Sequence, residues 1–221
     1  MDWRRWHDDY ERPDSTISRR LRCIREQLAL ALDGCPPGPV RSVSLCAGQG
    51  DDLLGVLVGH PRRPDVRALL VELDPRNAAV AQARAEAAGL TGVQVVVGDA
   101  ALVDQYRDLA PAELVLVCGV FGNLVDTDVQ VTVAACGQLC TDGGTVIWTR
   151  HRGDPPDRVP WICAEFERHG FERVWVSEPD AGYGVGVHRR RGAPDPWIGG
   201  RRLFTFVGYD ELSRRRSERE R

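Results

Sequence analysis

The sequence contains no lysine, and all 29 of its basic residues are arginine. Schiff-base and pyridoxal enzymes and the phosphate-binding loop of P-loop proteins each need a lysine, so this absence excludes those classes. No apolar run approaches the roughly 18 residues that a membrane-spanning helix needs. No secretory signal is present, so we expect a cytoplasmic protein without a membrane partner. The net charge of -3 argues against nucleic acid as a partner.

The seven cysteines lack the paired spacing of a metal site. Cys136 and Cys140 are four residues apart on an expected helix, but no histidine follows at ligand distance. An odd number of cysteines without a secretory signal predicts reduced thiols, most of them buried. The sequence therefore predicts neither a disulfide framework nor a metal site.

The length of 221 residues and the hydrophobic content of 43% predict one domain with a full core. We expect an N-terminal part over 1–40, a main domain over 41–212 and a charged tail over 213–221. Apolar residues at spacings of three and four predict a helix from Asp14 or Ser15 to Leu32. Aromatic residues crowd the stretch before it, from Trp3 to Tyr10. That stretch either folds over a ligand as a lid or docks the terminus on the core.

A glycine-rich loop follows the first predicted strand. An apolar run beginning at Val43 ends in Gly48 and Gly50, and apolar residues then recur at helical spacing. Because glycine lacks a Cβ, the turn can take positive φ and a ligand can lie directly on the backbone. We interpret the loop as the floor of a binding site.

The residues after the two glycines indicate the kind of ligand. A dinucleotide fingerprint has a third glycine three residues after the second, where this chain has Leu53. Asp51 and Asp52 stand where a pyrophosphate would arrive and would repel it. These features favour a nucleoside that carries positive charge and no phosphate over NAD or ATP.

Small or acidic residues follow the ends of the neighbouring predicted strands. Glu72 ends the second strand, where a carboxylate accepts hydrogen bonds from a ribose diol. Asp99 follows the third strand, and the stretch from Cys118 to Asn123 follows the fourth. Ligands in open α/β sheets bind at the carboxyl ends of the strands. We therefore expect these side chains to line one site.

Taken together, these motifs resemble those of the class I S-adenosylmethionine-dependent methyltransferases. The matching residues are Gly48 and Gly50 in the loop, Glu72 at the ribose position and Asp99 at the position for the adenine amino group. The turn Gly143–Gly144 before the expected fifth strand completes the match, which runs from about Arg41 to Trp148.

The chain departs from the family pattern at two positions. Ser44 stands where the family usually has an acid, and Cys46 stands where it has the first loop glycine. These departures bear on how the methionine amino group is held. Asp51 or Asp52 is the expected substitute for the missing acid.

The resemblance implies a Rossmann-like sheet of seven mostly parallel strands, with an antiparallel last strand and helices on both faces. It also implies S-adenosyl-L-methionine as cofactor, S-adenosyl-L-homocysteine as product and methyl transfer by SN2 displacement. Holding the two reactants in line supplies most of such a catalyst's effect, so a general base is optional. The expected cofactor-binding residues are Cys46, Ala47, Gly48, Gly50, Glu72, Leu73, Asp99, Ala100, Cys118 and Asn123.

The acceptor and the catalytic residues are less defined by the sequence. His151 follows the expected fifth strand and Tyr10 lies in the aromatic stretch, and these two are the candidate catalytic residues. We expect a small-molecule acceptor, since the Pro-Pro-aromatic motif of base methylation is absent after the fourth strand. A nonenzymatic cofactor-binding protein and another alkyl transferase remain alternatives, and oligomerisation stays open.

The last third of the chain gives two possibilities for the antiparallel last strand. Leu203–Val207 has stronger strand character than Val185–Arg189, so we favour it. The stretch Asp180–Arg202 is then expected to be a long loop beside the site. Asp126 is expected to cap the helix that precedes the fifth strand.

Overall fold

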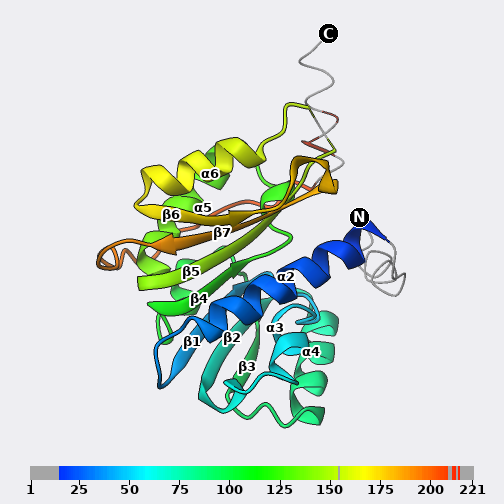
Figure 1. The fold of residues 1–221 in the computed structure, drawn as a ribbon, viewed down its shortest axis with the longest axis vertical. Coiled ribbons are helices and arrows are strands. Elements are labelled where there is room, and N and C mark those ends of the chain that lie inside the picture. Colours follow the sequence, from blue (N-terminus) through cyan, green and yellow to red (C-terminus); the bar gives the residue numbers. More distant parts are fainter. Residues whose placement is uncertain (1–14, 154, 209–210, 213, 215–221) are drawn as a thin grey trace.

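The computed structural model describes residues 15–153, 155–208, 211–212 and 214. Its centre is one sheet of seven strands in the order β3-β2-β1-β4-β5-β7-β6 (Figure 1). The strands are β1 Val40–Leu45, β2 Val66–Glu72, β3 Val93–Val97, β4 Ala112–Val117, β5 Cys140–His151, β6 Phe171–Val176 and β7 Tyr183–Arg190. The pairs among β1 to β5 are parallel, and β7 is antiparallel to both β5 and β6. The predicted fold class is confirmed.

Three helices cover one face of the sheet: α2 Thr16–Asp33, α3 Leu53–Leu57 and α4 Pro75–Ala87. The side chain of Ser15 caps α2, that of Asp52 caps α3 and that of Asp74 caps α4 by accepting backbone N–H groups. The buried hydrophobic side chains between these helices and the sheet are all aliphatic. We call this the aliphatic face.

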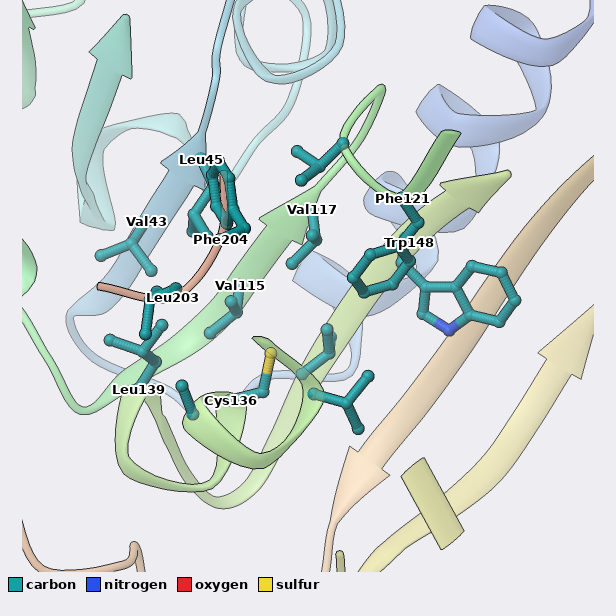
Figure 2. Close-up of a cluster of buried hydrophobic side chains, with 14 of the residues drawn as sticks. Val43, Leu45, Val115, Val117, Phe121, Cys136, Leu139, Trp148, Leu203 and Phe204 are labelled. Carbon is teal, nitrogen blue, oxygen red and sulfur yellow. The ribbon is translucent and has the colours of Figure 1, made fainter. Parts of the chain in front are cut away.

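In the described part of the chain, the opposite face carries two long helices, α5 Asp126–Leu139 and α6 Val159–Arg168. Between β3 and β4 the chain forms only a short 3-10 helix, η3 Val103–Tyr106. Aromatic rings fill the space beneath α6, where Trp148 stacks on Phe166 and Phe121 lies against both. Figure 2 shows Phe121 and Trp148 within this cluster. We call this the aromatic face.

A buried histidine belongs to the aromatic face. His188 of β7 is 0% exposed, its Nδ1 accepts the Nε1–H of Trp148 at 3.0 Å, and its ring stacks on Phe166 with centroids 4.7 Å apart. Among the described residues its Nε2 has no hydrogen-bond partner. Burial, reinforced by the positive charge of Arg173, lowers the pKa of His188 to about 3. The ring is therefore neutral in the folded protein.

The expectation for the last strand was wrong. The alternative segment Val185–Arg189 forms most of β7, whereas Leu203–Val207 forms no strand. Strand propensity misled because β7 contains two glycines that its packing requires. A Cβ on Gly184 would lie 2.3 Å from Val159 Cγ2, and one on Gly186 would lie 2.3 Å from Trp148 Cε2.

Residues 192–208, which we call the strap, cross the aromatic face after β7. Leu203 and Phe204 of the strap are buried over Val43, Leu45 and Val115, as Figure 2 shows. The strap thus covers a part of the sheet that, within the described residues, has no long helix over it, because the connection from β3 to β4 contains only the short η3. Leu203 and Phe204 are buried by packing against side chains, and not by pairing in the sheet.

Three smaller expectations also need correction. The stretch Asp180–Arg202 is not one long loop, because it contains most of the 3-10 helix Pro179–Ala181, all of β7 and part of the strap. Asp126 is the first residue of α5 and not its cap, which is Val125. The turn Gly143–Gly144 lies inside β5, at a shift in its register with β4. Among the described residues, no helix is both long and apolar enough to cross a bilayer.

Candidate functional site

A cavity of about 580 Å³ opens at the carboxyl ends of β1, β2 and β4. Its walls come from the loops after these strands and after β3, from the first turns of α2, and from the strap. The lining residues are Arg20, Leu21, Ile24, Cys46, Ala47, Gly48, Gln49, Asp51, Asp52, Glu72, Leu73, Asp74, Asn77, Asp99, Ala100, Ala101, Cys118, Gly119, Arg202, Phe204 and Phe206. The cavity therefore lies where an open α/β sheet binds ligands.

The loop after β1 forms the floor of the cavity. Gly48 and Gly50 have φ of 57° and 72°, as their positions in the loop predict. Cys46 also has a left-handed φ of 51°, so this cysteine adopts the conformation that favours glycine. Gly50 does not line the cavity, because it faces Leu54, whose Cδ1 would lie 2.6 Å from an added Cβ. Its role is to let α3 pack closely on the loop.

Two arginines from flanking helices hold this loop. Arg25 of α2 donates Nε and Nη2 to the carbonyl oxygen of Asp51 at 2.8 and 2.6 Å. Arg84 of α4 donates to the Asp51 carboxylate at 2.7 Å and to the carbonyl oxygen of Gln49 at 3.2 Å. The loop is thus fixed from both sides by charged donors. Sequence reasoning missed both arginines.

Glu72 is the buried carboxylate at the centre of the cavity, with 9% of its surface exposed. Its Oε2 accepts the backbone N–H of Gly48 at 2.8 Å, and its Oε1 accepts that of Asp74 at 2.9 Å. The carboxylate thereby joins the ends of β1 and β2. Each oxygen retains a lone pair for a hydroxyl donor, because a carboxylate accepts about four hydrogen bonds in all.

Asp99 lies on the wall formed by the loop after β3. Its Oδ1 accepts the backbone N–H of Ala101 at 3.0 Å, and its Oδ2 accepts Nη2 of Arg202 at 2.7 Å. Arg202 belongs to the strap, so an ion pair joins two segments that are far apart in the sequence. The side chain of Asp99 is therefore held in one orientation at the edge of the cavity.

The opposite wall carries a second buried carboxyl group. Asp52 lines the cavity and accepts the backbone N–H of Leu53 at 2.7 Å. Burial raises the pKa of the Asp52 carboxyl, and the neighbouring Asp51 charge adds to the shift. A cation that reached this wall would favour the ionised form of Asp52.

Two cysteine thiols line the cavity, and neither is a reactive thiolate. Burial raises the pKa of the Cys46 thiol, and the charges of Glu72 and Asp99 raise it further. Burial likewise raises the pKa of Cys118, with a contribution from Asp52. Both thiols are therefore protonated at neutral pH and act as small apolar surfaces.

The structure brings together most of the residues expected to bind a cofactor. Those that line the cavity are Cys46, Ala47, Gly48, Glu72, Leu73, Asp99, Ala100 and Cys118. Asn123 lies behind the wall, where its Nδ2 donates to the carbonyl oxygen of Gly119 at 2.9 Å. Their part in binding stays a prediction.

The two candidate catalytic residues are not placed in the cavity wall by the described part of the chain. His151 is the exposed last residue of β5 and pairs with Tyr183 of β7. Tyr10 lies outside the described residues, as does the whole aromatic stretch proposed as a lid. The catalytic roles of His151 and Tyr10 stay predictions.

Sequence reasoning missed the cavity residues of α2 and of the strap. Leu21 and Ile24 were expected only as part of the apolar face of the first helix, and nothing was predicted for Arg20. Phe204 and Phe206 had been assigned to a strand. No local pattern marks these residues, since they reach the cavity only through tertiary packing. Asn77 was detectable, because the first turn of α4 follows directly on the Glu72 strand end.

Within the part of the chain that the structure describes, no group of three or more histidine, cysteine or acidic residues could hold a metal ion. Neither a family model nor a curated protein matches the sequence. The fold, in contrast, has many counterparts among solved structures.

Three solved structures illustrate the similarity. The CurJ carbon methyltransferase matches with a TM-score of 0.65 at 14% identity, over 84% of this chain and 58% of its own. An O-methyltransferase family protein from Burkholderia thailandensis matches with a TM-score of 0.59 at 15% identity, over 76% and 56%. A 1,6-didemethyltoxoflavin-N1-methyltransferase from the same organism, solved with S-adenosylhomocysteine, matches with a TM-score of 0.57 at 20% identity, over 78% of each chain.

The chain spans a little over half of the length of the first two of these proteins. At such low identities the comparison concerns the fold alone. The strand order, the antiparallel β7 and the cavity at the strand ends agree with it. The chain has the fold of the class I S-adenosylmethionine-dependent methyltransferases.

Proposed function

We propose that this protein is an S-adenosylmethionine-dependent methyltransferase acting on a small-molecule acceptor. The observation that carries the proposal is the buried carboxylate of Glu72, which lines the cavity with both oxygens oriented by backbone N–H groups. A fixed acidic acceptor at the end of the second strand fits the hydroxyl pair of a ribose.

The other residues of the cavity fit a positively charged nucleoside. Asp52, Glu72 and Asp99 all line it, and three carboxyl groups would repel the phosphates of NAD or ATP. Gly48 presents backbone without a side chain, so a ligand can lie close to the floor. The cavity volume of about 580 Å³ lies within the usual range for small-molecule sites.

We assign the two ends of the cofactor from the positions of these groups. Glu72 would accept the ribose hydroxyls and Asp99 would accept the adenine amino group. Asp52 is a better candidate than Asp51 for the methionine ammonium group, because the Asp51 carboxylate already pairs with Arg84. A bound ammonium would also offset the burial of the Asp52 charge.

When bound, S-adenosylmethionine would supply a methyl group activated by its sulfonium charge. The acceptor atom would form a bond to the methyl carbon while the C–S bond breaks, and the electron pair of that bond would stay on the sulfur of S-adenosylhomocysteine. The task of the chain is to hold the two reactants in line and to exclude water. Correct alignment contributes on the order of 7 to 11 kcal/mol in such reactions. A general base is thus not required by the chemistry, and any proton of the acceptor can pass to solvent.

The small size of the acceptor is supported by one neighbour of similar fold, which was solved with 1,6-didemethyltoxoflavin bound. The aliphatic side chains of Leu21 and Ile24 and the rings of Phe204 and Phe206 give the cavity a largely apolar wall. We propose a compact, partly apolar acceptor that enters beside Leu21 and Ile24. Whether oxygen, nitrogen, sulfur or carbon is methylated is left to acceptor screening.

The first test is calorimetric titration of the purified protein with S-adenosylmethionine and S-adenosylhomocysteine. The wild-type protein should bind both. Glu72→Gln should bind each about 5- to 150-fold more weakly, the scale of about 1 to 3 kcal/mol for a hydrogen bond to a charged acceptor. Glutamine keeps one acceptor oxygen, so the loop contact to a backbone N–H can survive in this variant.

The matched control is Glu178→Gln, which changes an exposed glutamate outside the cavity in the same way. It should bind like the wild type. Equal affinity of folded Glu72→Gln and wild-type protein would contradict the assigned pocket. Release of S-adenosylhomocysteine with a panel of phenols, amines and thiols then separates an enzyme from a protein that only binds the cofactor.

A further inference from the structure

We propose that Arg202 makes the strap the base-selecting element of the cavity, by fixing Asp99 as an acceptor for an exocyclic amino group. This inference rests on the proposed function and concerns the same cavity. It adds a segment after the last strand to the residues that determine the ligand. Arg202 acts through Asp99 and is therefore a positioning residue.

The strap is anchored on both sides of the cavity by backbone hydrogen bonds. Before the cavity, the N–H of Val103 donates to Arg201 at 3.1 Å and that of Leu203 donates to Ala101 at 2.7 Å. After it, the N–H of Val207 donates to the carbonyl oxygen of Asn123 at 2.9 Å. The stretch between these anchors thus bridges the loop after β3 and the loop after β4, and it has little freedom to move away.

One further contact fixes the middle of this bridge. The N–H of Thr205 donates to the Asp128 carboxylate of α5 at 2.7 Å. Phe204 and Phe206, on either side, line the cavity with their ring centroids 6.2 Å apart. The two rings are tilted by 60° to each other, so the strap presents two apolar aromatic rings to the cavity that Asp99 also lines. A planar heterocycle can pack against one of these rings.

Arg202 restricts how Asp99 can bind that heterocycle. The Nη2–H of Arg202 occupies one lone pair of Oδ2, and the N–H of Ala101 occupies one of Oδ1. The ion pair holds the carboxylate against rotation. A carboxylate has about four acceptor sites, so one site on each oxygen stays available to a ligand.

The available sites discriminate between bases by their hydrogen-bonding edge. An ionised carboxylate only accepts hydrogen bonds, so it binds the 6-amino group of adenine and repels the 6-oxo group of hypoxanthine. A site built to pair with a donor rejects an analogue that lacks it far more strongly than an apolar pocket does. The geometry points to an amino-purine nucleoside, with the preference dependent on Arg202.

The experiment compares S-adenosylhomocysteine with its inosine analogue, which has a 6-oxo group and an N1–H in place of the 6-amino group and the unprotonated N1 of adenine. Both affinities are measured by calorimetry for wild type, Arg202→Met and Arg202→Lys. We expect the wild-type protein to prefer the adenine compound at least tenfold. Arg202→Met should lower this ratio at least threefold, and lysine should restore part of it because it keeps a cationic donor.

Two matched variants isolate the effect. Arg201→Met removes a neighbouring arginine that is not among the residues lining the cavity, and it should leave the ratio unchanged. Glu72→Gln should weaken both compounds equally, because the ribose is common to them. In an Asp99→Asn background, replacing Arg202 should have no further effect on the ratio, since the amide both donates and accepts hydrogen bonds.

The outcomes separate this inference from the proposed function. If wild-type protein binds neither compound, the proposed function fails and the inference fails with it. If it binds S-adenosylhomocysteine while folded Arg202→Met keeps the wild-type ratio, the function stands and the inference is overturned. Should the methionine variant lose its fold, Arg202→Gln is measured in its place. The same ratio decides the result.

Discussion

The two faces of the sheet are covered in different ways. On the aliphatic face, three helices bury leucine, isoleucine, valine and alanine. On the aromatic face, two long helices and the strap enclose Phe121, Trp148, Phe166 and Phe204. The first face is built from repeated helical contacts, whereas the second depends on a few large side chains in fixed orientations. We expect the second face to respond more strongly to single substitutions.

The largest effect on the free energy of unfolding is expected in the strap, which covers part of the aromatic face without a helix. Phe204 is 4% exposed and belongs to the core cluster, so Phe204→Ala should lower the free energy of unfolding by about 3 to 5 kcal/mol. Chemical denaturation measures this change. If the strap were only a surface segment, the loss would be far smaller.

Phe206 is the matched control within the same strap. It is 39% exposed, so Phe206→Ala should change the free energy of unfolding by less than about 1 kcal/mol. Similar losses in the two variants would mean that the strap is stabilised by its backbone contacts and not by the buried ring of Phe204.

A smaller loss is expected where β7 passes against Trp148. The Cβ of an alanine at position 186 would lie 2.3 Å from Trp148 Cε2, so either the indole or the strand must shift. Gly186→Ala should cost about 1 to 3 kcal/mol in unfolding free energy, the usual range for overpacking. Gly59→Ala is the control, because nothing lies within 4 Å of its added Cβ. An unchanged stability for Gly186→Ala would mean that the aromatic layer adapts easily.

An effect of similar size to that of Gly186→Ala is expected in the dependence of stability on pH. The pKa of His188 is lowered to about 3 in the folded protein, whereas its ordinary value is about 6.5. Well above pH 6.5 the imidazole is neutral in both the folded and the unfolded chain, so it does not change the free energy of unfolding there. As pH falls below that value, the unfolded chain binds a proton that the folded chain does not. Stability is therefore lost, by about 2 kcal/mol from pH 6 to pH 4.5.

His188→Gln removes this titration while keeping an acceptor for the Trp148 Nε1–H. The difference in unfolding free energy between wild type and variant should narrow as pH falls from 6 to 4.5, as followed by urea denaturation at each pH. A difference that does not vary with pH would mean that His188 is accessible to protons in the folded state.

The contrast between the faces also explains what the sequence could predict. On the aliphatic face the spacing of apolar residues predicted α2 and, after the glycine loop, α3. Each signal is local, because it depends on residues within one or two turns. The aromatic face gave weaker signals, since β7 needs glycine and Leu203–Val207 alternates like a strand while lying outside the sheet.

The residues of the candidate site also divide into those that the sequence could predict and those that it could not. Gly48, Glu72 and Asp99 were predicted to lie in one site because each follows a strand whose carboxyl end faces the same edge of the sheet. Arg202 could not be predicted, since its place beside Asp99 depends on the whole course of the strap. Cys46 was noted as a departure from the glycine pattern, and its left-handed φ explains how the loop keeps its shape without that glycine.

The cavity draws one wall from α2 and another from the strap, which are far apart in the sequence. During synthesis on the ribosome, the glycine loop and Glu72 emerge well before Arg202 and Phe204. Until then the cavity lacks a wall and the sheet lacks part of its cover. A ligand that needs both walls can therefore bind only after the strap has been made.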